Sequence, residues 1–393
     1  MYFILFYLCT MKSICLFNPD NDMALAYGKP HFVVRRSIRK MADDLSFLPA
    51  WYAEKGSWVL VDSADRIELF QKYCPFNLDV NFTTQPTSDF DTVRPWGWNP
   101  SLCYDLQLKG FPPDSFPNEE RMRKIRNLSS RLTAVEILKQ FQGTDYLIGD
   151  ATVLTRETDV EQYVYSHDKI VLKAPWSGSG RGVQFVSPDS WNASLKSWVS
   201  RVLLTQEAIV AEQCYVKSVD FAIEFYSDVK GVSFAGYSLF ETDDNGVYKR
   251  NILASDKEIE KKLVEYVPLC ALSHIKSRLK QQLFEQIHGV YQGYLGVDML
   301  ISKGKVHPCV EINLRMNMGI LSRILFDNYI YPTSRGCFYI EYYPHSDEAL
   351  KAQQQMRSDY PLTLESDRIS KGYLPLTPVK KDTSYAVYIM VSG

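Results

Sequence analysis

Short apolar runs alternate with helical periodicity over the first third of the chain. Residues 13–17, 57–63 and 78–82 have the length and apolar content of strands. Residues 35–48 repeat their apolar positions at helical spacing. This alternation predicts a small domain of βα layers over residues 11–127.

A strand-rich pattern follows in the centre of the chain. Ser129 and Ser130 precede an apolar helical stretch, and either residue can act as its N-cap. Residues 256–290 have helical periodicity that Pro268 breaks or kinks. Runs rich in β-branched and aromatic residues predict strands at 169–175, 183–186, 209–213, 219–227 and 231–241, followed by two strands that meet at a Lys303–Gly304 turn.

Composition shifts suggest where the domains begin and end. Residues 90–118 contain five prolines, which indicates a long irregular surface connection. We expect a central domain over residues 128–345, with subdomains at about 128–208 and 209–345. Residues 346–393 form a C-terminal segment whose pattern indicates no particular structure.

The first ten residues are mostly apolar but are not typical of a targeting segment. They lack the positively charged start and the small-residue cleavage site of a signal peptide, and Met11 opens a more ordinary beginning. We therefore interpret residues 1–10 as an upstream extension, with a signal peptide as the weaker alternative. No apolar run reaches the roughly 18 residues that a membrane span requires, so we expect no membrane segment.

The charge balance narrows the class of partner. The 393 residues include 44 Lys and Arg against 46 Asp and Glu, a net charge of −2, which excludes a protein held to nucleic acid by bulk charge. Hydrophobic residues make up 46% of the chain, enough for packed cores. Eight widely separated cysteines with no metal-like spacing predict reduced thiols and a cytoplasmic location.

A glycine-rich loop at residues 177–182 follows a strand that ends in Lys173. Glycines let backbone N–H groups approach a polyphosphate closely, and the lysine adds positive charge beside them. The loop alone fits a flexible hairpin between two strands equally well.

Two acidic residues come next. Glu212 ends a strand, and Asp220 follows eight residues later. Such a segment can offer an acidic acceptor and backbone groups to a purine, and a second carboxylate to a ribose or a metal. Taken singly, each residue is more typical of a solvent-facing strand position.

The strongest feature surrounds the Lys303–Gly304 turn. Asp298 and Glu311 lie thirteen residues apart on either side of it, and strand alternation places Glu311 and Asn313 on one face. Hard oxygen ligands of this kind suit Mg²⁺. Arg315 has the same parity and can reach the charge that develops on a transferred phosphoryl group. The alternative, an exposed polar hairpin face, fits the apolar setting of these acids less well.

In this order, the motifs resemble the ATP-grasp superfamily of carboxylate–amine and carboxylate–thiol ligases. The resemblance covers residues 128–330, and the sequence EINLR at 311–315 most resembles the biotin carboxylase and carbamoyl phosphate synthetase branch. It implies an α/β (α+β) fold, in which an N-terminal βα pre-grasp domain precedes a two-subdomain ATP-grasp unit with antiparallel sheets. No single motif is decisive, but the ordered set is.

The resemblance also implies nucleotide-binding roles. Lys173 would contact the α- and β-phosphates beneath a lid formed by the 177–182 loop. Glu212 would face the adenine amino group or the ribose side, and the 213–215 backbone would read the purine edge. The implied ATP-binding residues are Arg131, Lys173, Ser177, Gly178, Ser179, Gly180, Gly182, Glu212, Gln213, Cys214, Tyr215, Asp220, Lys249 and Arg250.

Metal binding and catalysis are assigned in the same way. Arg315 and Lys173 would be catalytic at the reacting phosphoryl or acyl centre. The Mg²⁺ ligands, with Mn²⁺ as an alternative metal, would be Asp298, Glu311 and Asn313.

Two positions depart from the family pattern. Arg131 replaces the usual lysine about forty residues before Lys173, which keeps the charge but changes the geometry. Residues 295–297 are Leu-Gly-Val where one branch carries an arginine before its first metal aspartate. Transition-state stabilisation would therefore depend on Arg315.

The implied activity is a Mg²⁺- and ATP-dependent ligase that joins a small-molecule carboxylate, activated as an acyl phosphate, to an amine or a thiol. A small-molecule kinase and a non-catalytic nucleotide-binding module are the alternatives. The sequence indicates neither the two substrates nor the oligomeric state.

Two N-terminal segments have ambiguous roles. Residues 17–26, FNPDNDMALA, follow a strand at a place where α/β folds bind ligands, but we expect Asp22 to act as a helix N-cap. Trp96 and Trp98 could face a substrate, although aromatic residues in a proline-rich loop usually hold the loop in place.

Overall fold

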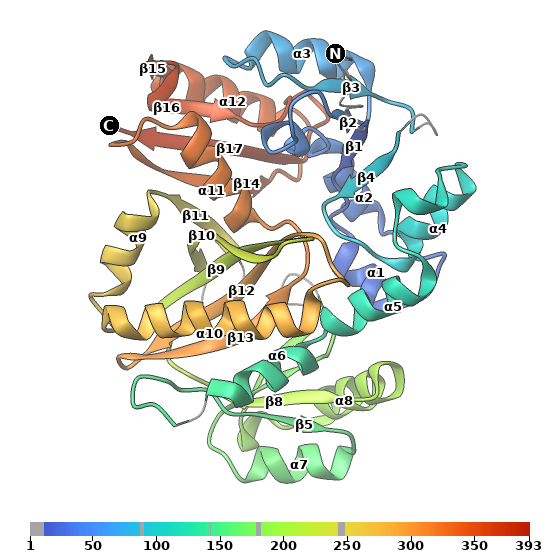
Figure 1. Ribbon diagram of the computed structural model, residues 1–393, viewed down its shortest axis with the longest axis vertical. Coiled ribbons are helices and arrows are strands. Elements are labelled where there is room, and N and C mark those ends of the chain that lie inside the picture. The colour runs from blue at the N-terminus through green and yellow to red at the C-terminus, as the bar shows by residue number, and fades with distance from the viewer. Residues whose placement is uncertain (1–11, 87–89, 142, 178–181, 243–247) are drawn as a thin grey trace, which may run out of the picture.

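The computed structural model describes residues 12–86, 90–141, 143–177, 182–242 and 248–393 (Figure 1). Within these residues, a four-stranded parallel sheet is followed by a four-stranded and a nine-stranded antiparallel sheet. The predicted α/β architecture is confirmed. No helix in these ranges is long and apolar enough to cross a membrane.

The N-terminal sheet has the strand order β3-β2-β1-β4. Its strands are β1 (Ser13–Leu16), β2 (Trp58–Leu60), β3 (Asn81–Thr83) and β4 (Thr92–Pro95). The helices of this unit are α1 (Asn21–Tyr27), α2 (Arg36–Asp44), α3 (Ala64–Tyr73), α4 (Pro100–Leu108) and α5 (Glu119–Leu128). Every residue of β1 is buried, as expected for a central parallel strand.

The expectation of an irregular connection over residues 90–118 is wrong, because β4 and α4 lie within it. Asn99 caps α4, since its side-chain oxygen accepts the Leu102 N–H at 2.9 Å. Pro100 occupies the first helical turn, where its missing N–H costs nothing. Pro95 is the last residue of β4 and Pro100 is the first residue of α4, so these prolines lie at the ends of regular elements and do not prevent them from forming.

The second sheet has the order β5-β8-β6-β7. Its strands are β5 (Ala151–Leu154), β6 (Ile170–Lys173), β7 (Val183–Val186) and β8 (Ile209–Gln213). The neighbouring helices are α6 (Arg131–Leu138), α7 (Glu157–Tyr165) and α8 (Ala193–Gln206). Ser130 caps α6 by accepting the Leu132 N–H at 3.2 Å, so one of the two predicted caps is confirmed.

The nine-stranded sheet has the order β13-β12-β9-β10-β11-β14-β17-β16-β15. Its strands are β9 (Val219–Asp228), β10 (Gly231–Thr242), β11 (Tyr248–Leu253), β12 (Gly293–Ser302), β13 (Lys305–Asn313), β14 (Arg335–Tyr342), β15 (Thr363–Glu365), β16 (Arg368–Pro375) and β17 (Tyr385–Ser392). Its helices are α9 (Asp256–Leu263), α10 (Leu269–Ile287), α11 (Met318–Tyr329) and α12 (Glu348–Asp359). Pro268 separates α9 from α10, which confirms the predicted break.

Residues 346–393, whose sequence pattern indicated no structure, supply α12 and the strands β15–β17. β17 pairs with β14 along its whole length, from Tyr385 opposite Tyr342 to Ser392 opposite Arg335. The C-terminal segment therefore continues the central sheet.

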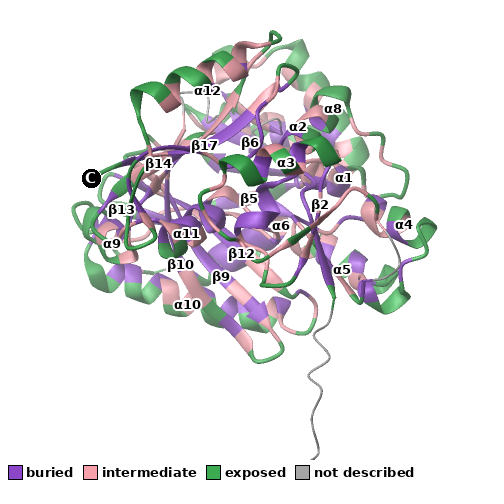
Figure 2. Ribbon diagram, turned by 90° about the horizontal axis from the view of Figure 1, so that it is seen from above, coloured by how far each residue is buried: buried purple, intermediate pink, exposed green. Residues whose placement is uncertain are grey.

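The two faces of this sheet have different chemistry. Phe221 and Ile223 of β9 pack with Leu279 of α10 in the largest core cluster. The register sets Asp298 beside Ala222, on the opposite face from those apolar side chains. Figure 2 shows β9 and β12 largely buried, whereas the outer surface of α12 is exposed. The polar face is where the candidate site forms.

Candidate active site

Lys173 of β6 and Glu212 of β8 form a buried ion pair. The Lys173 Nζ–Glu212 Oε2 distance is 2.6 Å, and both side chains are 8% exposed. Val171 is the register partner of Glu212, so Lys173 lies two residues along on the same face, within reach of a long side chain. The structure thus brings together two of the predicted residues.

Arg131 extends from the first turn of α6 toward β13. Its guanidinium donates to the Ala174 carbonyl at 2.7 Å, to Ser177 Oγ at 2.6 Å and to the Glu311 carboxylate at 2.9 Å. The side chain is 5% exposed. Arg131 therefore links α6, the loop after β6 and the predicted metal ligand Glu311.

Ser177 and Gly182 mark the described ends of the glycine-rich loop. A Cβ atom on Gly182 would lie 2.3 Å from the Ser177 Cβ, so the chain can pass this close to Ser177 only with glycine at position 182. The Gly182 carbonyl accepts the Ala174 N–H at 2.8 Å. The predicted residues Gly178, Ser179 and Gly180 lie outside the described residues.

Asp298 and Glu311 are register partners on β12 and β13. The turn alone would set Asp298 opposite Cys309, and a β-bulge between Asp298 and Leu300 shifts the register so that Glu311 lies opposite it. Asn313 Nδ2 donates to Asp298 Oδ2 at 3.0 Å, so the third predicted ligand lies beside them. Burial raises the pKa of Asp298 to about 7, and the neighbouring Glu311 carboxylate adds to this. A bound cation would relieve the repulsion between the two acids.

The donor set fits a Mg²⁺ ion that is coordinated partly by the protein and partly by a bound phosphate, and not an ion enclosed by protein ligands alone. Within the described ranges, no group of three or more His, Cys, Asp or Glu side chains is arranged to hold a metal ion. Mg²⁺ commonly uses one or two carboxylates and completes its octahedron with phosphate oxygens and water. Asp298, Glu311 and Asn313 could therefore hold the metal together with a phosphate.

Arg315 forms an ion pair with Asp22 of the N-terminal unit. Its Nε and one terminal nitrogen donate to the two carboxylate oxygens of Asp22 at 2.8 Å each, and the latter nitrogen also donates to Asn313 Oδ1 at 2.9 Å. The expectation that Asp22 caps a helix is wrong, because Asp20 occupies the N-cap position of α1. Asp22 instead pairs with Arg315 of the candidate site, which the N-cap interpretation of this segment missed.

Both ambiguous N-terminal segments meet at this arginine. Gly97 forms an antiparallel bridge with Arg315. Asn18 holds Gly97 by donating to its carbonyl at 2.8 Å and accepting its N–H at 3.2 Å. A Cβ atom on Gly97 would lie 2.5 Å from the Asn21 side chain, so the segment at 94–100 packs directly on the one at 17–26. A cavity of about 20 Å³ lies beside them, lined by Asp22, Ser177, Glu311, Asn313 and Arg315, among others.

Glu224 of β9 is a second residue that the sequence reasoning missed. Its side chain is buried, and Oε2 accepts a hydrogen bond from Asn317 Nδ2 at 2.9 Å. A Cβ atom on Gly296 or on Gly319 would lie within 2.4 Å of a Glu224 carboxylate oxygen, so two glycines make room for the group. The available signal was an acid inside an apolar strand. Burial raises its pKa to about 8.

Other predicted residues lie on β8 and β9 or follow β8, and the charge of one of them, Asp220, adds to the rise in the pKa of Asp298. Asp220 accepts hydrogen bonds from Lys217 at 2.7 Å and Thr242 at 2.8 Å. Gln213 is the last residue of β8, and Cys214 and Tyr215 follow it.

Lys249 and Arg250 line a different part of the surface. Arg250 donates twice to Glu241 at 2.8 Å and once to Tyr339 at 3.2 Å. With Lys249 they border a groove of about 660 Å³ that shares no lining residue with the small cavity. The structure therefore does not bring this basic pair to Arg315.

No protein-family model matches the chain, and no curated protein matches it. Several solved structures are similar to the chain. N5-carboxyaminoimidazole synthetase from Staphylococcus aureus, complexed with ADP, is 14% identical with a TM-score of 0.51, and the match covers 97% of this chain and 92% of that one. Biotin carboxylase from Campylobacter jejuni is 14% identical with a TM-score of 0.53, covering 98% and 88%.

A third similar structure is the biotin carboxylase domain of 2-oxoglutarate carboxylase from Hydrogenobacter thermophilus, in complex with MgADP and bicarbonate. It is 11% identical with a TM-score of 0.52, and the match covers 97% of this chain and 86% of that one. All three are ATP-grasp enzymes, so the chain has the ATP-grasp fold, and the predicted fold is confirmed.

Proposed function

We propose that this protein is a Mg²⁺- and ATP-dependent ligase that activates a substrate carboxylate as an acyl phosphate and joins it to an amine, or less often to a thiol. The observation that carries this proposal is that three cationic side chains each pair with an acid of the candidate site: Lys173 with Glu212, Arg131 with Glu311 and Arg315 with Asp22. Each cation comes from a different element. Phosphoryl transfer depends mainly on positioning and charge neutralisation, which such a set can provide.

In this mechanism, the cations exchange their carboxylate partners for phosphate oxygens. Lys173 leaves Glu212 for the α- and β-phosphates, and Arg131 leaves Glu311 for the phosphate chain. This second exchange frees the Glu311 carboxylate as a metal ligand. When bound, Mg²⁺ supplies positive charge against the phosphate oxygens.

Arg315 acts at the reacting centre. The substrate carboxylate attacks the γ-phosphorus, and ADP departs with the bonding electrons of the broken P–O bond. Arg315 neutralises charge on the transferred phosphoryl group. The amine then attacks the acyl carbon, and phosphate leaves. Asp22 competes with the substrate for the same guanidinium, so substrate binding must loosen this ion pair.

The similar structures support the nucleotide part of the proposal. One is a complex with ADP and another holds MgADP and bicarbonate. Their low identity leaves the two substrates of this chain open.

ADP release by the purified protein tests the proposal. A panel of amino acids and small carboxylic acids is offered with ATP, with Mg²⁺ supplied or withheld, and products are identified by mass spectrometry. We expect Mg²⁺-dependent ADP release and a product joined through a new amide bond. A stable phosphorylated product would instead indicate a kinase. Binding of MgATP without ADP release for any acceptor would indicate a non-catalytic module.

A further inference from the structure

His307 of β13 is a buried polar residue for which the proposed reaction has no role. The residue is 1% exposed, and neither ring nitrogen has a hydrogen-bond partner from another residue in the described part of the chain. Burial lowers its pKa to about 4, so at neutral pH the ring is uncharged and carries one N–H donor. Buried donors without partners are rare in folded proteins and need an explanation.

The surroundings of His307 place it beside the predicted base-binding residues. Its Nε2 atom lies 3.8 Å from Glu212 Oε2, just beyond hydrogen-bond length. The Tyr215 ring meets the imidazole edge to face at 6.0 Å between centroids. A Cβ atom on Gly149 would lie 2.7 Å from the ring, so the chain before β5 closes tightly over it. The imidazole is therefore held in place next to the Glu212 carboxylate.

In the proposed function, nucleotide binding removes the cation that balances the charge of Glu212. In the structure, its charge is compensated by Lys173 Nζ at 2.6 Å. If Lys173 turns toward the phosphates, a carboxylate that is 8% exposed loses its cation, which is costly in a buried environment. A new donor must then approach the carboxylate. Within the described residues, His307 is the other basic side chain within 4 Å of it.

We propose that His307 is a positioning residue of the nucleotide site, which donates its Nε2–H to Glu212 when Lys173 moves to the phosphates and so orients the carboxylate to accept the 6-amino group of adenine. This inference rests on the proposed function. It makes His307 a determinant of base specificity, because a purine with a 6-oxo group cannot donate to Glu212.

Calorimetric titration of the full-length protein with ADP and with inosine diphosphate, both with Mg²⁺, tests the proposal. His307→Leu removes the donor at similar volume, and His307→Gln keeps a neutral side chain with an N–H donor. Loss of a hydrogen bond to a charged group typically weakens binding about 10- to 100-fold. We expect that loss for ADP in His307→Leu, a much smaller loss for inosine diphosphate, and recovery to within about threefold of the native affinity in His307→Gln.

Thermal unfolding of the same variants separates positioning from a purely structural role. His307→Leu replaces an unpartnered polar side chain in the core, so its melting temperature should not fall. The matched control is His345→Leu, the same chemical change at an exposed position shortly after β14, which should change neither binding nor melting.

The outcomes distinguish this inference from the proposed function. If the native protein bound neither nucleotide, the proposed function would fail and the role of His307 with it. If the native protein bound ADP, but His307→Leu bound both nucleotides as before or lost both equally, only the assignment of His307 would be overturned.

Discussion

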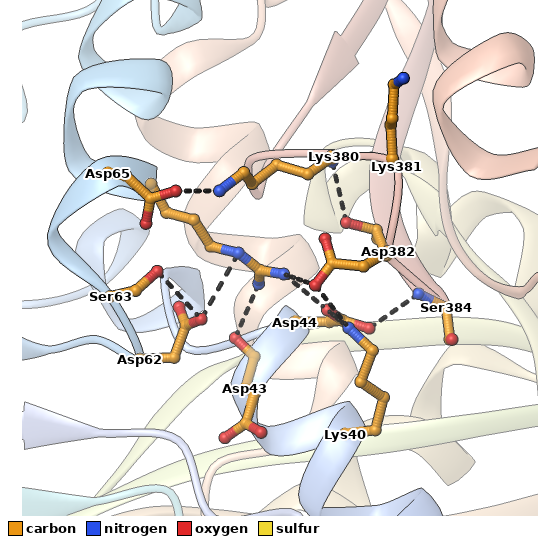
Figure 3. A network of polar contacts seen from close by, with 12 residues as sticks. Lys40, Asp43, Asp44, Asp62, Ser63, Asp65, Lys380, Lys381, Asp382 and Ser384 are labelled. Carbon is orange, nitrogen blue, oxygen red and sulfur yellow. Dashed lines mark hydrogen bonds and ion pairs between the residues drawn. The ribbon is translucent and has the colours of Figure 1, made fainter. Parts of the chain in front are cut away.

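Two ionic networks in this chain join segments that are far apart in the sequence, and they differ in how completely their charges are paired. The first, here called the terminal clamp, consists of Lys40, Asp44, Arg66, Asp382 and Ser384 (Figure 3). One Asp44 oxygen accepts from Lys40 at 2.6 Å and Arg66 at 3.0 Å, and the other accepts the backbone N–H groups of Ser384 at 2.9 Å and Tyr385 at 3.1 Å. Asp44 is fully buried, and four donors satisfy it.

The second network, that of the candidate active site, includes Asp298, Glu224 and His307, and its polar groups are less completely paired. Burial raises the pKa of Asp298 to about 7 and that of Glu224 to about 8, and His307 has no donor or acceptor partner from another described residue. Strongly shifted titratable groups gather where a protein meets a ligand. The completely paired network thus has the character of a structural joint, whereas the incompletely paired one has the character of a binding site.

The largest expected effect is loss of stability when the terminal clamp is broken. Asp44→Ala leaves the buried Arg66 guanidinium and two backbone N–H groups short of an acceptor, which should lower the free energy of unfolding by about 3–5 kcal/mol. Urea denaturation measures this loss. Asp382→Ala is the matched control, because that side chain is 72% exposed, and it should change stability by no more than about 0.5 kcal/mol. Equal losses in the two variants would contradict the structural role of Asp44.

The second expected effect is on turnover. Lys173→Ala or Arg315→Ala removes a donor to the reacting phosphates, which typically raises the barrier by about 2.7–4 kcal/mol and lowers turnover on the order of 10²–10³-fold. ADP affinity should fall much less in Arg315→Ala than in Lys173→Ala, because Arg315 acts at the transferred phosphoryl group. Steady-state ADP release and calorimetry measure the two quantities.

Arg335→Ala is the control for this pair, because it removes an exposed arginine of β14 that donates to Glu258 and is not one of the predicted site residues. It should leave turnover unchanged. Normal turnover in both Arg315→Ala and Glu311→Gln would show that the catalytic assignment is wrong.

The part of the site that the sequence predicted is the part that local geometry determines. Asp298, Glu311 and Asn313 meet within one hairpin, where strand alternation sets them on one face and a β-bulge between Asp298 and Leu300 brings Glu311 opposite Asp298. Lys173 and Glu212 meet because adjacent strands pair. Patterns of this range can be read from a single sequence.

The missed part depends on how distant units pack. Asp22 and Arg315 are separated by 293 positions, and no local pattern indicates that they pair. The same reasoning failed for residues 90–118, where proline content concealed β4 and α4. It also gave no structure for the C-terminal strands, whose pairing with β14 depends on a partner strand elsewhere in the chain.

The smallest expected effect is a gain in stability at Glu224. The ordinary pKa of this side chain is 4.5, and burial raises it to about 8 in the folded protein. Between these values the unfolded chain releases the proton and the folded chain keeps it, so the free energy of unfolding falls as the pH rises from 4.5 to 8. Glu224→Gln cannot ionise and keeps an oxygen to accept the Asn317 amide. The variant should exceed the native protein by about 1–3 kcal/mol at pH 8 and by much less near pH 5.

Urea denaturation at both pH values tests this last expectation, with Glu365→Gln on the exposed strand β15 as the control that should change stability at neither pH. If Glu224→Gln were destabilised by the same amount at pH 5 and pH 8, the folded protein would hold Glu224 as a carboxylate, in partnership with a nearby cation such as Arg315. Glu224 would then resemble Asp44, a carboxylate whose charge is satisfied within the protein. The pH dependence of this one substitution therefore decides to which of the two networks Glu224 belongs.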